Sequence, residues 1–181
     1  MKKLLIYILS LVMVLMFISC DSKDDVNVGF SEKYLVGNMS GGSSFEDYDV
    51  WRNMVLKYRI CYDGCVEIYM PSSTDKNATY ELAGSYQLTK DEIEYLKKSI
   101  NQKKLYKLDP KPDYGTCDGE SKILYLYDKN DEVLKTCGGY VPTNSDFLDM
   151  YKAVINTIHV DEHIRIREEW TNKLKSEAGV K

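Results

Sequence analysis

The chain has 181 residues, of which 24 are basic and 28 are acidic, so its net charge at pH 7 is −4. No segment concentrates lysine and arginine, which argues against nucleic acid as a partner. The length is sufficient for one domain with a hydrophobic core of its own.

The first element along the chain is a short apolar run near the N-terminus. Lys2 and Lys3 precede it, and it extends from Leu4 to Ile18. A run of this length behind two lysines is too short to span a bilayer and is typical of an export signal. We therefore expect residues 1–19 to be a signal peptide.

Ser19 and Cys20 follow the apolar run directly. A small residue followed by cysteine at this place resembles the lipobox of bacterial lipoproteins. The resemblance implies that Cys20 is lipidated with acyl chains such as palmitate and becomes the first mature residue. Several acyl chains would then anchor the protein to the membrane of the bacterial cell envelope. The alternative is a plain secretory signal that is cleaved near Ser19.

A polar segment follows the cysteine. Asp21–Asp25 resembles the short lysine- and aspartate-rich signal that sends lipoproteins of some Gram-negative bacteria to the outer face of the outer membrane. A solvated linker has the same composition. Residues 20–44 end in glycine and serine and are predicted to be a flexible tether. Apolar residues between Val26 and Val36 would allow part of this tether to pack on the domain as an extended segment.

The rest of the chain is predicted to fold as an α+β domain over residues 45–160, with a helical C-terminal extension over residues 161–181. Strands are expected where β-branched and aromatic residues cluster. The predicted strands are Val50–Ile60, Cys65–Met70, Thr79–Leu88, Leu105–Leu108, Ile123–Tyr127 and Val133–Cys137. Short turns at Asp63-Gly64 and Asn130-Asp131 make the sheet mainly antiparallel, because parallel strands need long crossovers.

Two amphipathic helices are predicted beside this sheet. Thr89 and Glu92 have the spacing of a capping box at the start of the first helix, and Ser145 is the expected cap of the second. Each helix has one apolar stripe, so we expect both on the same face of the sheet. The stripes are Ile93, Leu96 and Ile100, then Phe147, Tyr151, Val154 and Ile158, and Ile166, Trp170 and Leu174 in the extension. The other face would be lined by polar and tyrosine side chains and is the expected place for a partner.

Two segments of the chain resemble each other. Gly84-Ser85-Tyr86 precedes the first helix and Gly138-Gly139-Tyr140 precedes the second, and apolar positions of both helices match at the same offset. This pattern predicts a ββα unit that occurs twice. Chance similarity between two strand-to-helix junctions is the alternative.

Several short motifs occur in a fixed order along the domain. They are Cys61-Tyr62-Asp63-Gly64-Cys65, Leu88-Thr89, Leu105-Tyr106-Lys107-Leu108 and Asp118-Gly119. This order is similar to that of a family of small bacterial lipoproteins of unknown function, built around a C-x3-C hairpin. The resemblance covers the chain from Tyr58 to Ile158. It implies an α+β fold and supplies no activity.

The predicted domain contains Cys61, Cys65, Cys117 and Cys137. An even number of cysteines in an exported protein favours disulfides. Cys61 and Cys65 flank a tripeptide that suits a hairpin loop with Gly64 in the left-handed conformation, so they would face each other. A bridge between Cys117 and Cys137 would follow by elimination. The alternative is four reduced, half-buried thiols.

The sequence holds few candidates for catalysis. His159-Val160-Asp161-Glu162-His163 matches the inverted zinc-protease motif, in which two histidines bind zinc and Glu162 is the base. That motif needs a third ligand well downstream, and few residues follow, so we expect a solvated helix segment instead. The acidic loop Asp113–Glu120 lacks the spacing of a calcium-binding loop. No catalytic residue, cofactor or metal is therefore expected.

Together these features predict an envelope-tethered, non-enzymatic binding or accessory module whose partner is a protein or a glycan. The 15 tyrosines fit half-buried sheet surfaces and interfaces. An inhibitor or immunity-type protein against an exported enzyme or toxin is the alternative. A secreted metal-dependent hydrolase is a further one.

Overall fold

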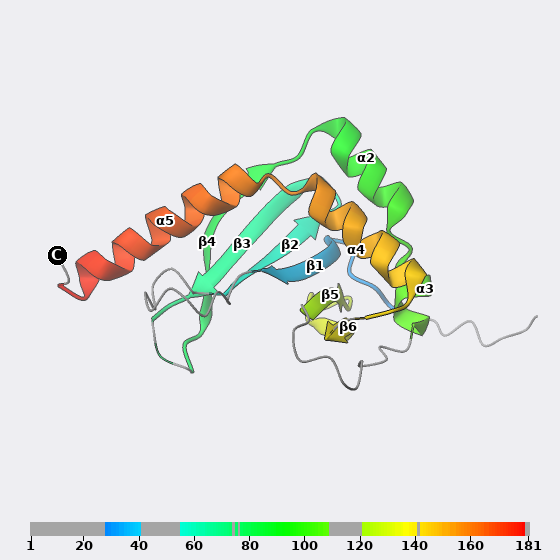
Figure 1. Ribbon diagram of the computed structural model, residues 1–181, viewed down its shortest axis with the longest axis horizontal. Coiled ribbons are helices and arrows are strands. Elements are labelled where there is room, and N and C mark those ends of the chain that lie inside the picture. The colour runs from blue at the N-terminus through cyan, green and yellow to red at the C-terminus, as the bar shows by residue number, and fades with distance from the viewer. Residues whose placement is uncertain are drawn as a thin grey trace, which may run out of the picture.

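The computed structural model describes residues 28–40, 55–73, 75, 77–108, 121–140 and 142–179. These residues form a six-stranded antiparallel sheet with the strand order β4-β3-β2-β1-β5-β6. The strands are β1 (Tyr34–Ser40), β2 (Leu56–Cys61), β3 (Cys65–Pro71), β4 (Tyr80–Gln87), β5 (Ser121–Tyr127) and β6 (Val133–Tyr140). The helices are α2 (Lys90–Ser99), α3 (Gln102–Lys107), α4 (Ser145–Thr157) and α5 (Val160–Glu177). The helices lie along one side of the sheet (Figure 1), which confirms the predicted α+β fold.

Some of the predictions fall on residues outside this description. The signal peptide over residues 1–19, the lipidation of Cys20 and the thiol of Cys117 are among them. They therefore stay predictions. Of the helices that are described, none combines the length and the apolar character needed to cross a membrane.

The turn between β2 and β3 has the conformation that the sequence predicts. It consists of Tyr62, Asp63 and Gly64, and Gly64 has a φ of 90°, which glycine adopts without a steric cost. The Asp63 side chain accepts a hydrogen bond of 2.9 Å from the N–H of Cys65. The N–H of Gly64 donates to the carbonyl of Cys61 at 3.0 Å. These contacts hold the ends of the two strands together.

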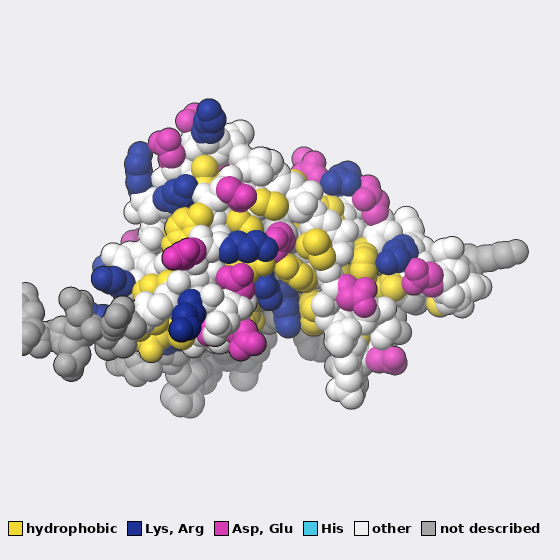
Figure 2. Space-filling model, turned by 180° about the vertical axis from the view of Figure 1, so that it is seen from behind, with side chains coloured by type: hydrophobic (Ala, Val, Ile, Leu, Met, Phe, Trp, Pro, Cys, Tyr) yellow, Lys and Arg dark blue, Asp and Glu magenta, His cyan; other side chains and the backbone are white. Residues whose placement is uncertain are grey.

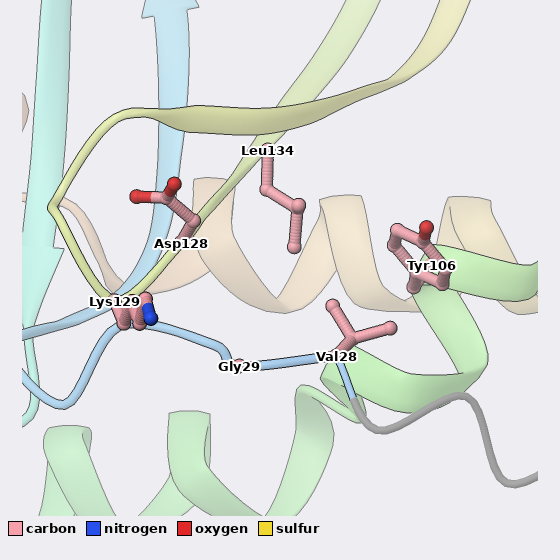
Figure 3. Close-up of a pocket in the computed structure, with 6 residues that line it drawn as sticks. All are labelled: Val28, Gly29, Tyr106, Asp128, Lys129 and Leu134. Atoms are coloured by element: carbon pink, nitrogen blue, oxygen red, sulfur yellow. The ribbon is translucent and has the colours of Figure 1, made fainter.

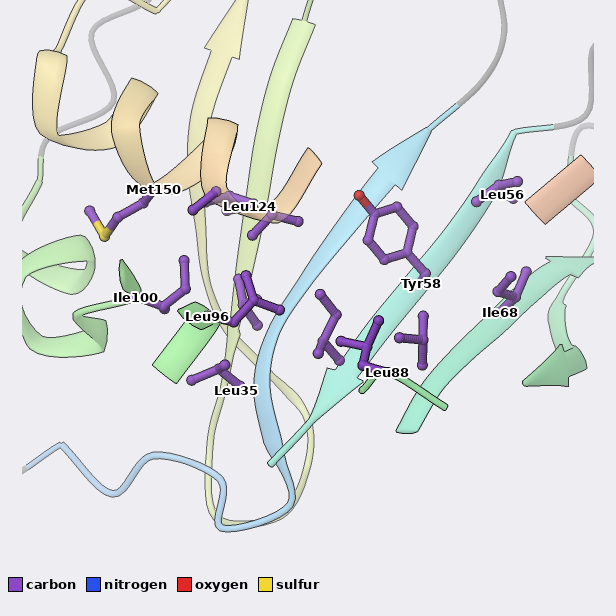
Figure 4. Packing of buried hydrophobic residues seen from close by; sticks show 14 of the residues in the cluster. Leu35, Leu56, Tyr58, Ile68, Leu88, Leu96, Ile100, Leu124 and Met150 are labelled. Atoms are coloured by element: carbon purple, nitrogen blue, oxygen red, sulfur yellow. The ribbon is translucent and has the colours of Figure 1, made fainter. Parts of the chain in front are cut away.

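Alternation along the strands divides the sheet into two faces. The residues of β2 and β3 that point towards the helices are Leu56, Tyr58, Ile60, Val66, Ile68 and Met70. They pack with helix residues in one core, where Leu96 and Met150 approach the strands (Figure 4). We call this side the inner face. The alternate residues, such as Arg59 and Glu67, lie on the opposite, outer face.

Local capping interactions begin α2 and α4 close to the predicted positions. The hydroxyl of Thr89 accepts a hydrogen bond from the N–H of Glu92, and the Glu92 carboxylate accepts one of 2.7 Å from the N–H of Thr89. This is the expected capping box. The cap of α4 is Asn144 and not the predicted Ser145, because the Asn144 side chain accepts a hydrogen bond of 3.0 Å from the N–H of Phe147. Asn and Ser serve equally well as caps.

One predicted strand is a helix. Leu105–Leu108, expected as a short strand, falls in α3 and its C-terminal cap. The helix begins after Asn101, whose side chain accepts a hydrogen bond of 2.9 Å from the N–H of Lys104. Leu105 is completely buried in the core. A short apolar run fits a strand and a buried helical turn equally well, so periodicity alone does not distinguish them.

The folded domain begins earlier than residue 45. Tyr34–Ser40 lies within the predicted tether 20–44, yet it forms β1, which pairs with β2 on one side and with β5 on the other. Val36 is completely buried, and the buried side chain of Asn38 donates a hydrogen bond of 2.9 Å to the hydroxyl of Tyr58. The predicted boundary therefore comes too late. Apolar residues before the glycine- and serine-rich stretch supply a central strand.

The C-terminal extension is a single helix that packs on the sheet. Ile166, Trp170 and Leu174 of α5 are buried, as predicted from their spacing. The indole N–H of Trp170 donates to the carbonyl of Pro71 at 2.9 Å. A Cβ atom at Gly84 of β4 would lie 3.1 Å from side-chain carbons of Ile166, so the glycine permits this close packing. The orders β3–β4–α2 and β5–β6–α4 match the predicted ββα arrangement.

Candidate functional site

The outer face of the sheet carries a group of aromatic and charged side chains from four neighbouring strands. It consists of Tyr34, Arg59, Glu67, Tyr69 and Tyr127, and we call it the tyrosine–arginine cluster. The register places Arg59 of β2 beside Glu67 of β3. The same pairing places Tyr69, two residues further along β3, on the same face. Residues from β1 and β5 complete the cluster.

Arg59 lies at the centre of this cluster. Its Cζ atom is 5.0 Å from the ring centroid of Tyr34, 4.8 Å from that of Tyr69 and 5.0 Å from that of Tyr127. Desolvation would lower the pKa of Arg59, but a hydrogen bond with Tyr34 and the nearby tyrosine oxygens raise it. Contacts between a cation and an aromatic ring contribute about 0.5–1 kcal/mol each near a surface. The three rings therefore hold the guanidinium in place while it stays charged.

The carboxylate of Glu67 is paired with residues other than Arg59. Its Oε1 atom is 2.8 Å from Nζ of Lys33, and its Oε2 atom accepts hydrogen bonds of 2.9 Å from Tyr34 and 2.7 Å from Tyr69. Burial alone would raise the pKa of Glu67, but the hydrogen bonds from Lys33 and the two tyrosines lower it below its usual value. Glu67 is therefore an ionised carboxylate, with one oxygen paired with Lys33 and the other hydrogen-bonded to two tyrosines of the cluster.

Tyr34 and Tyr127 form the buried base of the cluster. Their ring centroids are 5.1 Å apart, and their exposed fractions are only 3% and 4%. Tyr127 lies across Gly37 of β1, where an added Cβ atom would stand 2.1 Å from the tyrosine hydroxyl oxygen. Aromatic rings often cover a strand glycine in this way. The position of Tyr127 thus depends on the missing side chain at residue 37.

Lys57 is a second cation on this face. It precedes Arg59 by two residues in β2, so both side chains leave the same side of the strand. Its Nζ atom lies 3.8 Å from the ring centroid of Tyr80. Among the residues that the structure describes, no carboxylate forms an ion pair with Lys57 or Arg59. Aromatic rings contact both cations, but they carry no negative charge that would neutralise them.

The coloured part of the space-filling view shows how charges are distributed on one side of the molecule. Hydrophobic side chains, which include tyrosine, reach the surface across the middle of that view, with basic and acidic side chains interspersed among them (Figure 2). No single sign of charge dominates the coloured surface.

The two histidines of the H-x-x-E-H pattern have separate partners. His159 is the N-cap residue of α5, and its Nε2 atom is 2.8 Å from Oε1 of Glu92. His163 is buried on the inner face, where its Nε2 atom is 3.0 Å from the hydroxyl oxygen of Tyr86. Burial is the main reason that the pKa of His163 is lowered to about 4. These contacts join α2, β4 and the first turn of α5.

Glu162 is engaged on the surface of its own helix. Its Oε2 atom is 2.7 Å from a guanidinium nitrogen of Arg165. Within the described ranges, no three histidine, cysteine, aspartate or glutamate side chains are placed to hold a metal ion together. The two histidines therefore join secondary-structure elements, and the prediction of a solvated helix segment was wrong for His163, which is buried.

Cys61 and Cys65 flank the turn between β2 and β3, and both pack in one small cluster with Tyr34 and Tyr127. Both thiols are free in the structure, so the disulfide between them stays a prediction. Burial raises the pKa of Cys61 to about 12, which disfavours the thiolate that a nucleophile requires. Cys137 lies on the inner face and donates to the carbonyl of Leu105 at 3.5 Å. Its predicted partner, Cys117, is not among the described residues.

A hollow of about 560 Å³ lies beside α3 and the turn between β5 and β6 (Figure 3). Its lining consists of Val28, Gly29, Tyr106, Asp128, Lys129 and Leu134. The Asp128 carboxylate accepts hydrogen bonds of 2.8 Å and 3.0 Å from the N–H groups of Asn130 and Glu132. It is thus committed to the turn. No set of polar groups converges among its described lining residues, and we assign no chemistry to it.

No protein-family model and no curated protein matches this sequence. Sequence reasoning anticipated a tyrosine-lined face but did not single out Arg59, Glu67 or Lys33. Alternation along the strand containing Lys57 and Arg59 would have placed both cations on the polar face. It would not have revealed their partners, because these come from strands that are distant in the sequence.

Proposed function

We propose that this protein is a lipid-anchored module of the bacterial cell envelope that binds a partner protein, without catalysing a reaction, through the outer face of its sheet. The observation that carries the proposal is the tyrosine–arginine cluster. Tyrosine and arginine are enriched at the energetic centres of protein interfaces. An antiparallel sheet needs only one packed face, so the core does not require such a cluster on the other.

The exposure of the rings favours a protein over a glycan as the partner. A sugar ring stacks on an exposed aromatic face, whereas Tyr34 and Tyr127 are only 3% and 4% exposed. Their rings instead hold the side chain of Arg59. Lys57 and Arg59 carry positive charge on a protein whose net charge is −4. The complementary partner is a protein surface that is acidic at this point.

Features elsewhere in the chain support a role without catalysis. The thiols of Cys61 and Cys137 have pKa values raised by burial to about 12 and about 11. Both histidines are engaged in contacts between secondary-structure elements. None of these groups combines the exposure and the activated state that a nucleophile or a general base needs.

An inhibitor or immunity-type protein is the second candidate. The packing around Arg59 favours it, because a rigid, preorganised surface loses little entropy on binding. Such a protein would block an exported enzyme or toxin with the same face. The purified partner's own activity, measured with and without this protein, separates the candidates: inhibition indicates the second and unchanged activity the first.

The anchoring part of the proposal is tested at Cys20. The wild-type protein should partition into the detergent phase of an envelope extract, and the Cys20→Ala variant should remain in the aqueous phase. Intact mass should show acyl chains on the mature wild type. A mature protein that begins at or before Cys20 without lipid would contradict the anchoring.

The binding part is tested with a photo-crosslinking amino acid at Ser85, which is exposed on the outer face of β4 opposite Glu67. The same group at Glu94, exposed on α2, is the control. We expect a discrete crosslinked protein from Ser85 that is absent from the control and lost in Arg59→Gln. Equal products from both positions, or a product that persists in Arg59→Gln, would contradict the proposed face.

A further inference from the structure

We propose that Lys57 and Arg59 form a binding site for two carboxylates that are two residues apart in an extended acidic segment of the partner protein. This inference rests on the proposed function for the nature of the partner. It adds the chemical group that the site binds, a carboxylate, and the spacing of two such groups along the partner's chain. Neither residue belongs to the buried core.

The spacing of the two cations follows from strand geometry. Residues i and i+2 of a strand point to the same face and are separated by roughly 6.5–7 Å along it. Lys57 and Arg59 have this relation in β2. An extended peptide lying along β2 has the same repeat. Carboxylates at its alternate positions would therefore meet the two cations together.

No carboxylate among the described residues forms an ion pair with Lys57 or Arg59. Glu67, the carboxylate paired with Arg59 in the register, is already hydrogen-bonded to Lys33, Tyr34 and Tyr69. The rings around Arg59 and the ring of Tyr80 beneath Lys57 attract a cation but do not cancel its charge. A carboxylate of the partner protein would therefore have no competing anion among the described residues.

The two cations differ in what they contribute. Arg59 offers a planar fork of donors that matches a carboxylate in two parallel hydrogen bonds, and its orientation is set in advance by three rings. Lys57 offers a point charge with less geometric demand. The structure therefore assigns the specificity for a carboxylate to Arg59 and the preference for a second one to Lys57.

The test measures binding of a fluorescein-labelled peptide in which glutamate alternates with serine. Its matched controls are the same peptide with glutamine in place of glutamate, and a peptide with the same glutamates placed next to each other. We expect the alternating glutamate peptide to bind best and the glutamine peptide to show no saturable binding. Binding should weaken as salt is added, because the site is only half-buried.

Variants separate the roles of the residues. Arg59→Gln should abolish binding, Arg59→Lys should weaken it by about tenfold through loss of the paired hydrogen bonds, and Lys57→Gln should remove the preference for alternating glutamates. Lys97→Gln on the exposed side of α2 should bind like the wild type. Circular dichroism and the unfolding midpoint establish that each variant is folded.

The outcomes distinguish this inference from the proposed function. Equal binding of the glutamate and glutamine peptides, or unchanged binding by folded Arg59→Gln, would overturn the carboxylate site, while an Arg59-dependent crosslink from Ser85 would still support the outer face. Tight binding of an acidic polysaccharide, with no binding of the peptide, would overturn the protein partner itself. A preference for adjacent over alternating glutamates would overturn the proposed spacing.

Discussion

The inner and outer faces of the sheet use the same strands for different purposes. On the inner face, Ile60, Leu96 and Val154 are completely buried, and the polar groups there pair with each other, as Tyr86 does with His163. On the outer face, rings surround a charged guanidinium that no described carboxylate neutralises. The inner face is used for packing within the fold. The outer face is where we propose that a partner binds.

The largest effect is expected at Leu96, which α2 contributes to the inner face. Leu96→Ala should lower the free energy of unfolding by about 2–5 kcal/mol, since it removes buried methyl groups and leaves a cavity. Urea denaturation followed by circular dichroism measures this. Tyr95→Ala, at the next position and 48% exposed, is the matched control and should change stability little. Similar losses in both variants would show that α2 does not face the core in this way.

The next effect is a dependence of stability on pH through His163. The folded protein keeps this histidine neutral, with a pKa of about 4, whereas the unfolded chain takes up the proton below about pH 6.5. The contribution of His163 is therefore complete above about pH 6.5 and is lost as the pH falls towards 4. The loss should amount to at most about 3 kcal/mol.

Urea unfolding at a series of pH values measures this slope, and His163→Gln is the variant that should flatten it. Glu92 contributes at lower pH, because hydrogen bonds with His159 and Thr89 lower its pKa to about 2. Stability from Glu92 is present above about pH 4.5 and is lost as the pH falls towards 2. An unchanged slope between about pH 6.5 and 4 in His163→Gln would rule out His163 as its source.

The smallest of the three effects is expected at two strand glycines, Gly37 on the outer face and Gly84 on the inner face. Gly37→Ala should cost about 1–3 kcal/mol, because its Cβ atom would stand 2.1 Å from the packed Tyr127 hydroxyl oxygen. Gly84→Ala on the inner face should cost less, since Ile166 carbons at 3.1 Å need to move only slightly. Denaturation of both variants gives the comparison.

A double-mutant cycle sharpens this comparison. Tyr127→Ala removes the ring, so Gly37→Ala in that background should be nearly neutral. An unchanged cost of Gly37→Ala without the ring would mean that the outer face is not packed around Tyr127. The cycle therefore tests the base of the tyrosine–arginine cluster directly.

Several elements of the fold could be predicted from the sequence because local interactions form them. Thr89 and Glu92 are three residues apart, and their reciprocal hydrogen bonds begin α2 wherever that helix lies. Gly64 produces its turn through its own backbone conformation. The spacing of Ile166, Trp170 and Leu174 likewise predicts the buried side of a helix without knowledge of what that side packs against.

The prediction was wrong where local patterns were equally compatible with two structures. Leu105 fits a strand or a helical turn, and packing in the core selected the helix. Tyr34–Ser40 lay beside residues typical of a tether, and only pairing with β2 and β5 made it a central strand. Both outcomes depend on neighbours far away in the chain.

The sequence by itself determined α2, α4 and α5, the hairpin turn and the alternation that separates two faces, since each depends on residues within a few positions of one another. The tertiary structure alone decided the candidate site. Glu67 accepts a hydrogen bond from the hydroxyl of Tyr34, which is 33 positions away in the sequence. Arg59 is surrounded by rings from three different strands. These contacts exist because β1 lies between β2 and β5 in the sheet, an order that no local pattern in the sequence encodes.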